Sequence, residues 1–417
     1  MTPTGHAVVV GGGYAGLVAA RVLADHCQRV TIVERDAITD APAYRRGTPQ
    51  CRHPHGLLAR GAQILEQLFP GLREELASRG APISDFGRLP LRFPTGWSPS
   101  VQTGLAVQTF SRTLLESSIR KRVLARPNVT MRDRTPTTGL VRAATRISGV
   151  ELDGDRQISA DLVVIATGRH SQLPTWLVDA GLSTPRTLQV DGRLSYTSRL
   201  YHRSTGVRWH MSIQSTFAPT TRRGGVVNAL EDNSWIVCLF GADGEMAPTE
   251  PDGFTAYAES LANPYITEVV RDAAPASAIY RYAGLGGHWH RYDRLHDWPD
   301  GLAVLGDALC SLNPVYGHGM TIAAEQALLL GRSLHQFGNG AGCHRFQRRT
   351  RRTILIPWIL STSLDQGWDP RRAPLTATLA NKYMLNLLER IPENPDLYRK
   401  FLNVQHMMSS PLVLLQP

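Results

Sequence analysis

The feature that most constrains this chain is a glycine-rich turn near its start, Gly11-Gly12-Gly13-Tyr14-Ala15-Gly16. An apolar run at residues 6–10 precedes the turn, helical spacing follows at 15–23, and a second apolar run occupies 29–34. This order predicts a β-turn-α-β unit. A diphosphate binds close to backbone N–H groups at the positive end of a helix, where a side chain would block its approach. The turn therefore predicts a Rossmann-type unit that binds a dinucleotide.

An acidic residue at the expected distance supports this prediction. Glu34 lies 21 residues after Gly13, at the end of the second apolar run, where its carboxylate can accept hydrogen bonds from both hydroxyls of an adenosine ribose. A glycine-rich turn in an unrelated α/β domain is the alternative. The motif does not distinguish FAD from NAD.

A second segment favours a flavin. Gly306-Asp307-Ala308 follows a buried type of strand at 302–305, and the run 313–320, Asn-Pro-Val-Tyr-Gly-His-Gly-Met, leads into a helix expected from about 320 to 334. An aspartate at a strand end can hold a ribityl hydroxyl, and the start of a helix can offer N–H groups to the flavin edge that becomes negative on reduction. An ordinary β-loop-α connection with a capping aspartate is the alternative.

These residues resemble the late flavin motif of the group A flavoprotein monooxygenases, the family of p-hydroxybenzoate hydroxylase and squalene epoxidase. The resemblance extends over residues 5–335. It implies an α/β fold with a discontinuous Rossmann-type FAD-binding domain, an inserted antiparallel β-sheet substrate domain and a helical C-terminal region. It also implies that Arg112, which follows the helix-capping Ser111, reaches the ribityl and diphosphate part of FAD; a solvated arginine in the first turn of a helix is the alternative. Arg46 lies in the long loop after the second apolar run, where we expect it to cover the path by which the flavin re-enters. The matching residues are Gly306, Asp307, Pro314, Gly317 and Gly319.

The middle motif of the family is altered here. The family has Ala-Asp-Gly-x-x-Ser at the end of a strand, and this chain has Thr167 in place of the aspartate, followed by Gly168. The Thr-Gly form, the segment 45–55 and the run 313–320 resemble the bacterial polyether epoxidases of the lasalocid and monensin type. That branch implies a large, mostly apolar natural-product substrate from secondary metabolism. The threonine bears on the interaction with NAD(P)H more than on FAD binding.

The resemblance implies an FAD-dependent monooxygenase in which NAD(P)H, or a separate flavin reductase, supplies electrons. A flavin C4a-hydroperoxide would then epoxidise or hydroxylate the substrate. No side chain is assigned a catalytic role because the cofactor carries the chemistry, while Asp307 and Pro314 are expected to position the flavin. The expected cofactor-binding residues are Gly11, Gly13, Tyr14, Ala15, Gly16, Glu34, Arg35, Arg46, Arg112, Thr167, Gly168, Gly306, Asp307, Pro314, Gly317, Gly319 and Met320.

Three other functions use or could use the same fold. A geranylgeranyl-type prenyl reductase remains open because of the Thr-Gly form. A flavin-dependent halogenase would carry a W-x-W-x-I-P signature, which this sequence lacks. A nonenzymatic FAD-binding protein is the third alternative.

Apolar periodicity and turn residues divide the chain into four segments: 1–180 and 286–340 form the FAD-binding domain, 181–285 the β-rich substrate domain, and 341–417 the helical region. A β-meander is expected from strands at 129–133, 137–142 and 147–152. The insertion is expected to form an antiparallel sheet, and its aromatic residues and the C-terminal helices are expected to line a pocket. The expected strands of that sheet are 194–202, 207–214, 226–230 and 235–240, and the expected helix breaks are Pro357, Pro370 and Pro392.

Composition excludes several classes of protein. The net charge of +10 comes mostly from dispersed arginines, which argues against a nucleic-acid-binding stripe. Five cysteines without a C-x-x-C spacing favour a reducing cytoplasm and argue against a disulfide framework or a zinc site. The apolar stretch at 7–24 is interrupted by glycines and no other window approaches 18 apolar residues, so we expect a protein without a membrane span. The histidines lack the spacing of metal ligands: His53, His55, His288, His290 and His296.

Overall fold

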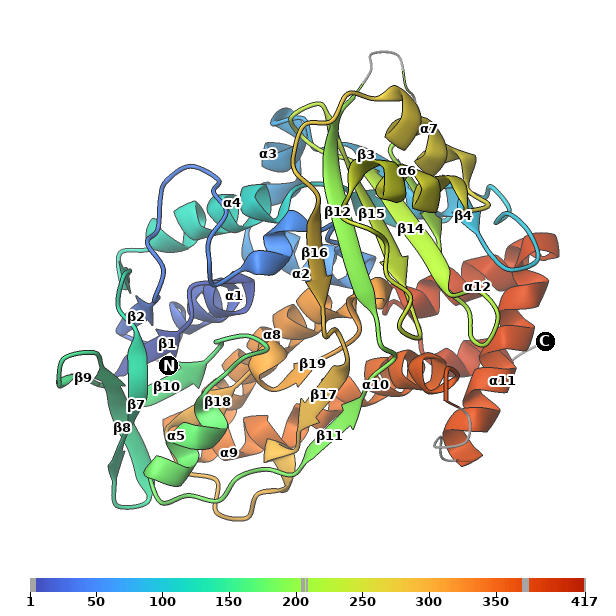
Figure 1. Cartoon of the computed structure of the whole chain (residues 1–417). Coiled ribbons are helices and arrows are strands. Elements are labelled where there is room, and N and C mark those ends of the chain that lie inside the picture. Colours follow the sequence, from blue (N-terminus) through green and yellow to red (C-terminus); the bar gives the residue numbers. More distant parts are fainter. Residues whose placement is uncertain (1–4, 204–206, 208, 370–374, 416–417) are drawn as a thin grey trace.

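The computed structural model describes residues 5–203, 207, 209–369 and 375–415. A five-stranded parallel sheet organises the part of the molecule that contains the chain start (Figure 1). The strand that completes it comes from far along the chain, so the polypeptide leaves this sheet and returns to it. This confirms the expected α/β class with a discontinuous Rossmann-type unit. In sheet order, the strands are β18 (Leu302–Val304), β10 (Leu162–Ile165), β1 (His6–Val10), β2 (Arg29–Val33) and β6 (Val129–Arg132).

Alternate side chains of this sheet enter two different cores, because successive residues of a strand point to opposite faces. Ala7 and Val9 pack among three helices on one face. Val8 and Val10 pack on the other face against a small antiparallel sheet and one helix. The first face is covered by α1 (Tyr14–Leu23), α4 (Arg112–Leu124) and α8 (His318–Phe337); the second by β7 (Thr137–Ala143), β8 (Arg146–Leu152), β9 (Arg156–Ser159) and α5 (Leu173–Asp179).

The expected β-meander is wrong in its first strand. Residues 129–132 pair in parallel with β2, and Val129 lies opposite Val30. The three-stranded antiparallel sheet consists instead of β7, β8 and β9. Periodicity and turn residues identify a strand but do not specify its partner, and here the open edge of β2 supplies the partner for β6.

A six-stranded sheet forms the second layer, as expected for the insertion. Helices α6 (Pro251–Glu259) and α7 (Pro264–Asp272) cover one of its faces. The edge strand β4 comes from outside segment 181–285 and pairs in parallel with β13, so the sheet takes in a piece of the first segment. In sheet order, its strands are β16 (Tyr280–Ala283), β12 (Ser195–His202), β15 (Ser234–Gly241), β14 (Arg223–Ala229), β13 (Met211–Gln214) and β4 (Leu91–Arg92).

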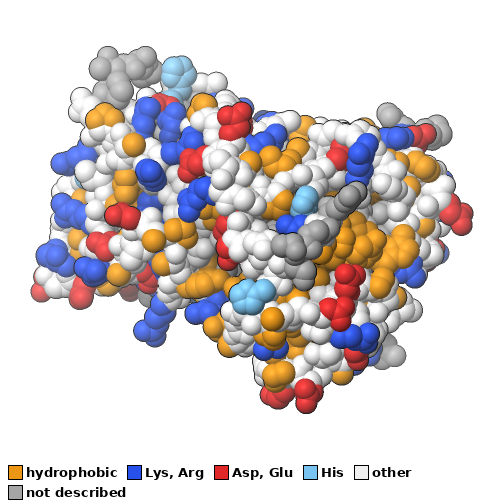
Figure 2. Space-filling model, turned by 90° about the horizontal axis from the view of Figure 1, so that it is seen from above, with side chains coloured by type: hydrophobic (Ala, Val, Ile, Leu, Met, Phe, Trp, Pro, Cys, Tyr) orange, Lys and Arg blue, Asp and Glu red, His pale blue; other side chains and the backbone are white. Residues whose placement is uncertain are grey.

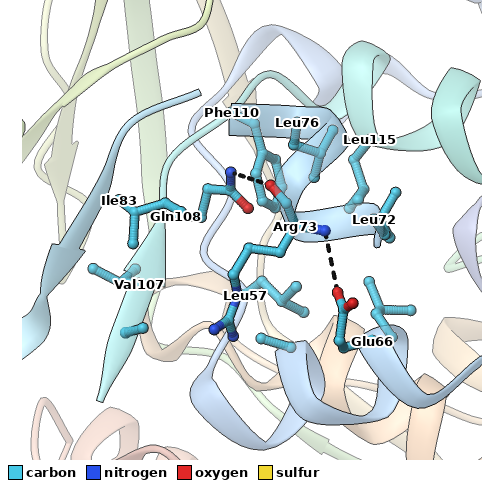
Figure 3. A pocket seen from close by; sticks show the side chains of 13 residues that line it. Leu57, Glu66, Leu72, Arg73, Leu76, Ile83, Val107, Gln108, Phe110 and Leu115 are labelled. Carbon is cyan, nitrogen blue, oxygen red and sulfur yellow. Dashed lines mark hydrogen bonds between the residues drawn. The ribbon is translucent and has the colours of Figure 1, made fainter. Parts of the chain in front are cut away.

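Smaller elements connect the two layers. One three-stranded sheet comprises β11 (Thr187–Val190), β17 (Gly287–His290) and β19 (Cys310–Ser311), and a two-stranded ribbon comprises β3 (Ile83–Asp85) and β5 (Ala106–Gln108). A gap of about 20 Å³ separates this ribbon from α2 (Ala59–Leu68) and α3 (Leu72–Ser78) (Figure 3). Gln108 donates to the Arg73 carbonyl across it at 3.1 Å. The gap has room for about one water molecule, which is too little for a cofactor or a substrate of similar size.

The C-terminal region is helical, as expected. Pro357 does not end a helix as predicted but lies inside α10, where Ile354 and Trp358 on either side of it are buried in the core and hold the helix together despite the missing N–H. Pro392 does separate two helices, and Pro370 lies outside the described residues. The helices are α9 (Asn339–Arg349), α10 (Arg351–Gln366), α11 (Leu375–Arg390) and α12 (Pro395–Gln405).

Surface charge is dispersed on the face shown in Figure 2. Lys and Arg side chains are more frequent on the left of that view, but Asp, Glu and apolar side chains lie among them. All five cysteines are free and buried. Across the described ranges, no helix is both long and apolar enough to cross a bilayer.

Candidate functional site

The two glycine-rich segments meet at one edge of the parallel sheet. Strands β1, β10 and β18 are neighbours and parallel, so the segments that follow them emerge at the same edge. Gly306 has φ +64°, and a Cβ added there would lie 2.8 Å from the Cβ of Ala15. The turn after β1 and the turn after β18 are therefore in contact.

A cavity of about 410 Å³ extends from this edge to the six-stranded sheet. Of the residues predicted for cofactor binding, Gly16 and Arg46 do not line it. Those that do are Gly11, Gly13, Tyr14, Ala15, Glu34, Arg35, Arg112, Thr167, Gly168, Gly306, Asp307, Pro314, Gly317, Gly319 and Met320.

The three glycines of the first turn have different tasks. Gly11 has φ +107°, and a Cβ there would collide with the carbonyl of Ala166, which directly follows β10. Gly16 lets α1 approach β1, since a Cβ there would collide with the carbonyl of Gly11. At Gly13 the space is open, with the nearest atom, Glu116 Oε1, 4.0 Å away. Gly13 thus leaves a hollow at the start of α1, and Gly16 serves packing.

The cavity wall contains Arg45 in the place expected for Arg46. Arg45 donates to Glu116 Oε2 at 2.8 Å, and its other nitrogen lies 3.4 Å from Glu34 and 3.7 Å from Asp36. These three carboxylates turn Arg45 inward, whereas Arg46 is exposed. Two adjacent arginines in a loop without periodicity give no signal for which one points inward.

The start of α1 is surrounded by anionic oxygens. Glu34 accepts from the Gly12 N–H at 2.7 Å, and Glu116 accepts from the Tyr14 N–H at 3.2 Å. Burial raises the pKa of Glu116, but Arg112 and Arg45 outweigh burial and hold this pKa below its usual value. Arg112 donates to Glu116 at 2.7 Å. The helix start therefore already binds carboxylates through backbone N–H groups.

Sequence reasoning missed Glu116. The one feature of the sequence that could have indicated Glu116 is its four-residue spacing from Arg112, which places both side chains on one face of α4.

The second wall of the cavity comes from the segment after β18. Partial burial of Asp307 in the cavity wall raises its pKa, while Arg169 and Arg112 oppose that shift. A Cβ on Gly319 would lie 3.8 Å from Asp307 Oδ1. Gly317 has φ +69° at the start of α8, and the Gly306 N–H donates to Gln326 at 2.8 Å. The carboxyl of Asp307 thus lies beside the first turn of α8, where glycines leave the backbone accessible.

The altered middle motif places a cation at the cavity. Thr167 donates to Ser171 Oγ at 2.6 Å, and Gly168 has φ +77°. Next to them, Arg169 lines the cavity and donates to the Gly286 carbonyl at 2.7 Å. The Thr-Gly turn is thereby tied to the loop that precedes β17.

The six-stranded sheet contributes an aromatic wall. The Nδ1 atom of His53 lies 2.8 Å from Ser198 Oγ, at hydrogen-bond distance. The His53 ring stacks on Tyr282, with the ring centroids 5.7 Å apart. Burial lowers the pKa of His53 to about 4 and that of His55 to about 3, so both rings are neutral near pH 7. Tyr196 and Leu285 complete this wall. Among the described residues no three His, Cys, Asp or Glu side chains are arranged to hold a metal ion.

The expectation that aromatic residues of the insertion line a pocket is met by these tyrosines on β12 and β16. The expectation for the C-terminal helices is wrong, since no lining residue comes from the described part of the helical C-terminal region. Helices α11 and α12 pack instead in a core at the β4 end of the six-stranded sheet, which includes Leu387, Tyr398 and Leu402 together with Phe86 and Phe93.

The class of cofactor follows from the family that matches the chain. The family described as an FAD binding domain matches residues 5–347. The chain belongs to this FAD-binding family. FAD is its cofactor, and membership of this family makes the protein an oxidoreductase.

Relatives and solved structures agree with that membership. Protein Rv3254 of Mycobacterium tuberculosis is 34% identical over 87% of this chain and 80% of its own length. The FAD-dependent monooxygenase ausM of Aspergillus calidoustus is 26% identical over 80% of this chain and 71% of its own length.

Two solved structures share the fold. The crystal structure of pqsL from Pseudomonas aeruginosa, a probable FAD-dependent monooxygenase, is 18% identical with a TM-score of 0.66 and covers 87% of this chain and 98% of its own. The flavin-dependent brominase Bmp2 is 14% identical with a TM-score of 0.67 and covers 97% of this chain and 100% of its own. At these identities the likeness establishes the fold alone.

The cavity of the FAD-binding protein fits this cofactor. The hollow at Gly13, the N–H groups that start α1 and the guanidinium of Arg112 suit a diphosphate. Glu34 directly follows β2, where a ribose would be held, and Asp307 is a partly buried carboxyl available to a ribityl hydroxyl.

Proposed function

We propose that this protein is an FAD-dependent monooxygenase that epoxidises or hydroxylates a large, mostly apolar natural-product intermediate. The observation that carries the proposal is a single cavity with two unlike walls. One wall consists of the glycine turns and charged side chains that suit FAD, and the other of Tyr196, Tyr282, Leu285 and neutral histidines. The name of the relative ausM, an FAD-dependent monooxygenase, supports the same reaction class.

Bound FAD, once reduced, would supply the chemistry of activating O2 so that one oxygen atom can be transferred to an electron-rich carbon centre. The residues of the chain bind and orient it. In the proposal, Gly13, Tyr14 and Arg112 hold the diphosphate, and Glu34 holds the adenosine ribose. Asp307, Pro314 and the amides near Gly319 and Met320 position the flavin ring.

The aromatic wall serves to exclude water. Tyr196 is 7% exposed and packs with Phe240 and Leu285 in a core of its own. The stack of His53 on Tyr282 closes the wall between the loop 36–56 and the sheet. A dry, apolar space suits a substrate without charge and protects a reactive oxygen species from water. The resemblance to polyether epoxidases supports a polyene or similar substrate and is part of this proposal.

The source of electrons is NAD(P)H in the proposal, either directly or through a separate flavin reductase. Thr167 replaces the aspartate that the family pattern has at this position. The neighbouring Arg169 is the cation that this turn presents to the cavity.

Mass spectrometry of products formed under ¹⁸O2 tests the proposal. The purified protein, loaded with FAD and reduced by light so that no nucleotide is needed, is mixed with an apolar polyene and oxygen. We expect a product that contains one ¹⁸O atom. A product that has gained two hydrogens would indicate a prenyl reductase, and one that has gained a halogen when bromide or chloride is present would indicate a halogenase; either result contradicts the proposal. Gly13→Asp protein, which we expect to lack FAD, is the control for uncatalysed oxidation.

A further inference from the structure

Asp365 is a buried carboxyl group that lies behind the cavity. It belongs to α10, is 4% exposed and does not line the cavity. Its Oδ1 accepts a hydrogen bond from Asn313 Nδ2 at 2.7 Å. Its Oδ2 has no hydrogen-bond partner among the described residues. A buried carboxyl oxygen without a partner is costly, above all when the carboxyl is ionised.

Asn313 connects this carboxyl to the cofactor cavity. It lines the cavity and is 2% exposed. Its Oδ1 accepts from the Val315 N–H at 3.0 Å, while its Nδ2 donates to Asp365. Both ends of the amide are thus fixed, and they fix the turn Pro314–Tyr316 that leads through Gly317 into α8. We call residues 313–317 the cofactor loop.

The groups around Asp365 do not favour its ionised form. Burial raises the pKa of Asp365 to about 7, Asn313 opposes this shift, and the carboxylate of Asp191 adds to it. Tyr196 of β12 and Tyr316 of the cofactor loop are the other titratable groups it acts on, and both stay neutral because burial raises their pKa values far above neutrality. Asp369, on the same segment, is exposed. No cation acts on the carboxyl from the described residues, so ionisation would leave a buried charge without a counterion.

We propose that Asp365 is a positioning residue that holds the cofactor loop in place through Asn313, and that its ionisation loosens the loop and weakens FAD binding. An ionised Asp365 gains hydration only if the cofactor loop moves away from it. The FAD site needs the same loop in its ordered position, because Pro314 and Gly317 line the cavity. The inference rests on FAD binding and does not depend on which reaction the flavin performs.

The direction of the effect follows from linkage. A folded-state pKa of about 7 lies above the ordinary value of 3.8. The stabilisation from the neutral carboxyl is therefore complete below about pH 4 and is lost as pH rises through about 7. Since FAD binds the ordered loop, its dissociation constant should rise between pH 6 and pH 8. One proton limits the rise to about tenfold per pH unit between about pH 4 and the folded-state pKa, and the dissociation constant levels off above about pH 7, so we expect a rise of about three- to tenfold across this interval.

FAD titration of the apoprotein at pH 6 and pH 8, followed by quenching of flavin fluorescence, tests the inference. We expect the several-fold rise in the dissociation constant for the natural protein and for Asp191→Asn, whose exposed carboxyl lies near Asp365 but does not contact the cavity. Asp365→Asn keeps the shape and an acceptor for Asn313 but cannot ionise, so its dissociation constant should be the same at both pH values. An Asp365→Asn protein with the natural pH dependence would overturn the proposal.

A second variant tests the route through Asn313. Asn313→Ala keeps the ionisable carboxyl but cuts its link to the cofactor loop, so we expect weaker FAD binding that no longer changes between pH 6 and pH 8. Retention of the natural pH dependence in Asn313→Ala would show that the coupling does not pass through Asn313 and would also overturn the proposal. Because the readout is binding without turnover, failure of the proposed oxygenation leaves this test unaffected.

Discussion

Replacement of Glu116 by glutamine should destabilise the apoprotein more than the loss of an exposed ion pair would. The Glu116 side chain is 4% exposed and accepts from Arg112 at 2.7 Å, Arg45 at 2.8 Å and the Tyr14 N–H at 3.2 Å. Glutamine keeps the shape but removes the charge, leaving Arg112 without its carboxylate partner in a buried position. Hydrogen bonds to charged groups contribute roughly 1.5–3 kcal/mol each, and loss of one partner of a buried pair costs about 3–5 kcal/mol. Arg45 retains Glu34 and Asp36, so we expect the lower end, about 3 kcal/mol of unfolding free energy.

Urea titration with and without excess FAD measures this change. Glu75→Gln is the matched control, since Glu75 also pairs with an arginine of α4, Arg122, but both side chains are roughly a third exposed, at 30% and 28%. We expect a loss of about 1 kcal/mol or less for that variant. Saturation with FAD should shrink the deficit of Glu116→Gln, because the diphosphate gives Arg112 a new anionic partner. A Glu116→Gln protein no less stable than the control, or one whose deficit FAD leaves unchanged, would refute this account of the site.

Two further predictions concern cofactor retention. Gly13→Asp should yield a folded but colourless protein, because the space at Gly13 admits a side chain and the carboxylate of the new aspartate would repel the diphosphate. Absorbance of the purified protein at the flavin bands measures the FAD content. A full FAD content would show that the first glycine turn does not bind the cofactor. Asp307→Ala should bind FAD about ten- to a hundredfold more weakly, as expected for the loss of one or two hydrogen bonds to a charged group. The melting temperature of the apoprotein should not change. An FAD affinity equal to that of the natural protein in a fluorescence titration would exclude Asp307 from flavin binding.

The backbone requirements of the two turns could be predicted from the sequence because they are local. A glycine is needed wherever φ is positive or another chain segment approaches closely, and Gly11 and Gly306 meet both conditions. The apolar runs around them were enough to predict β1, β2 and β18, since strands buried on both faces are continuously apolar.

Features that depend on distant partners could not be predicted. The inward turn of Arg45 follows from three carboxylates, of which one belongs to α4 and two to the segment after β2. The link between Asp365 and Asn313 joins residues 52 positions apart, and neither residue has a local pattern that marks it. Strand 129–132 has the composition of a hairpin strand but pairs with the open edge of β2. In each case the deciding interaction is a tertiary contact, which produces no periodic pattern in the amino-acid sequence.

The position of β18 at the edge of the parallel sheet has a consequence for biosynthesis. A ribosome finishes the first glycine turn early, but the strand that carries its counterpart leaves the exit tunnel only after the whole six-stranded sheet has been made. Until then the nascent polypeptide presents β10 with an unpaired edge and half of a nucleotide cleft. Chains truncated before residue 302 should therefore emerge colourless and prone to aggregation, and the yellow holoprotein can arise only after β18 and the start of α8 have been translated.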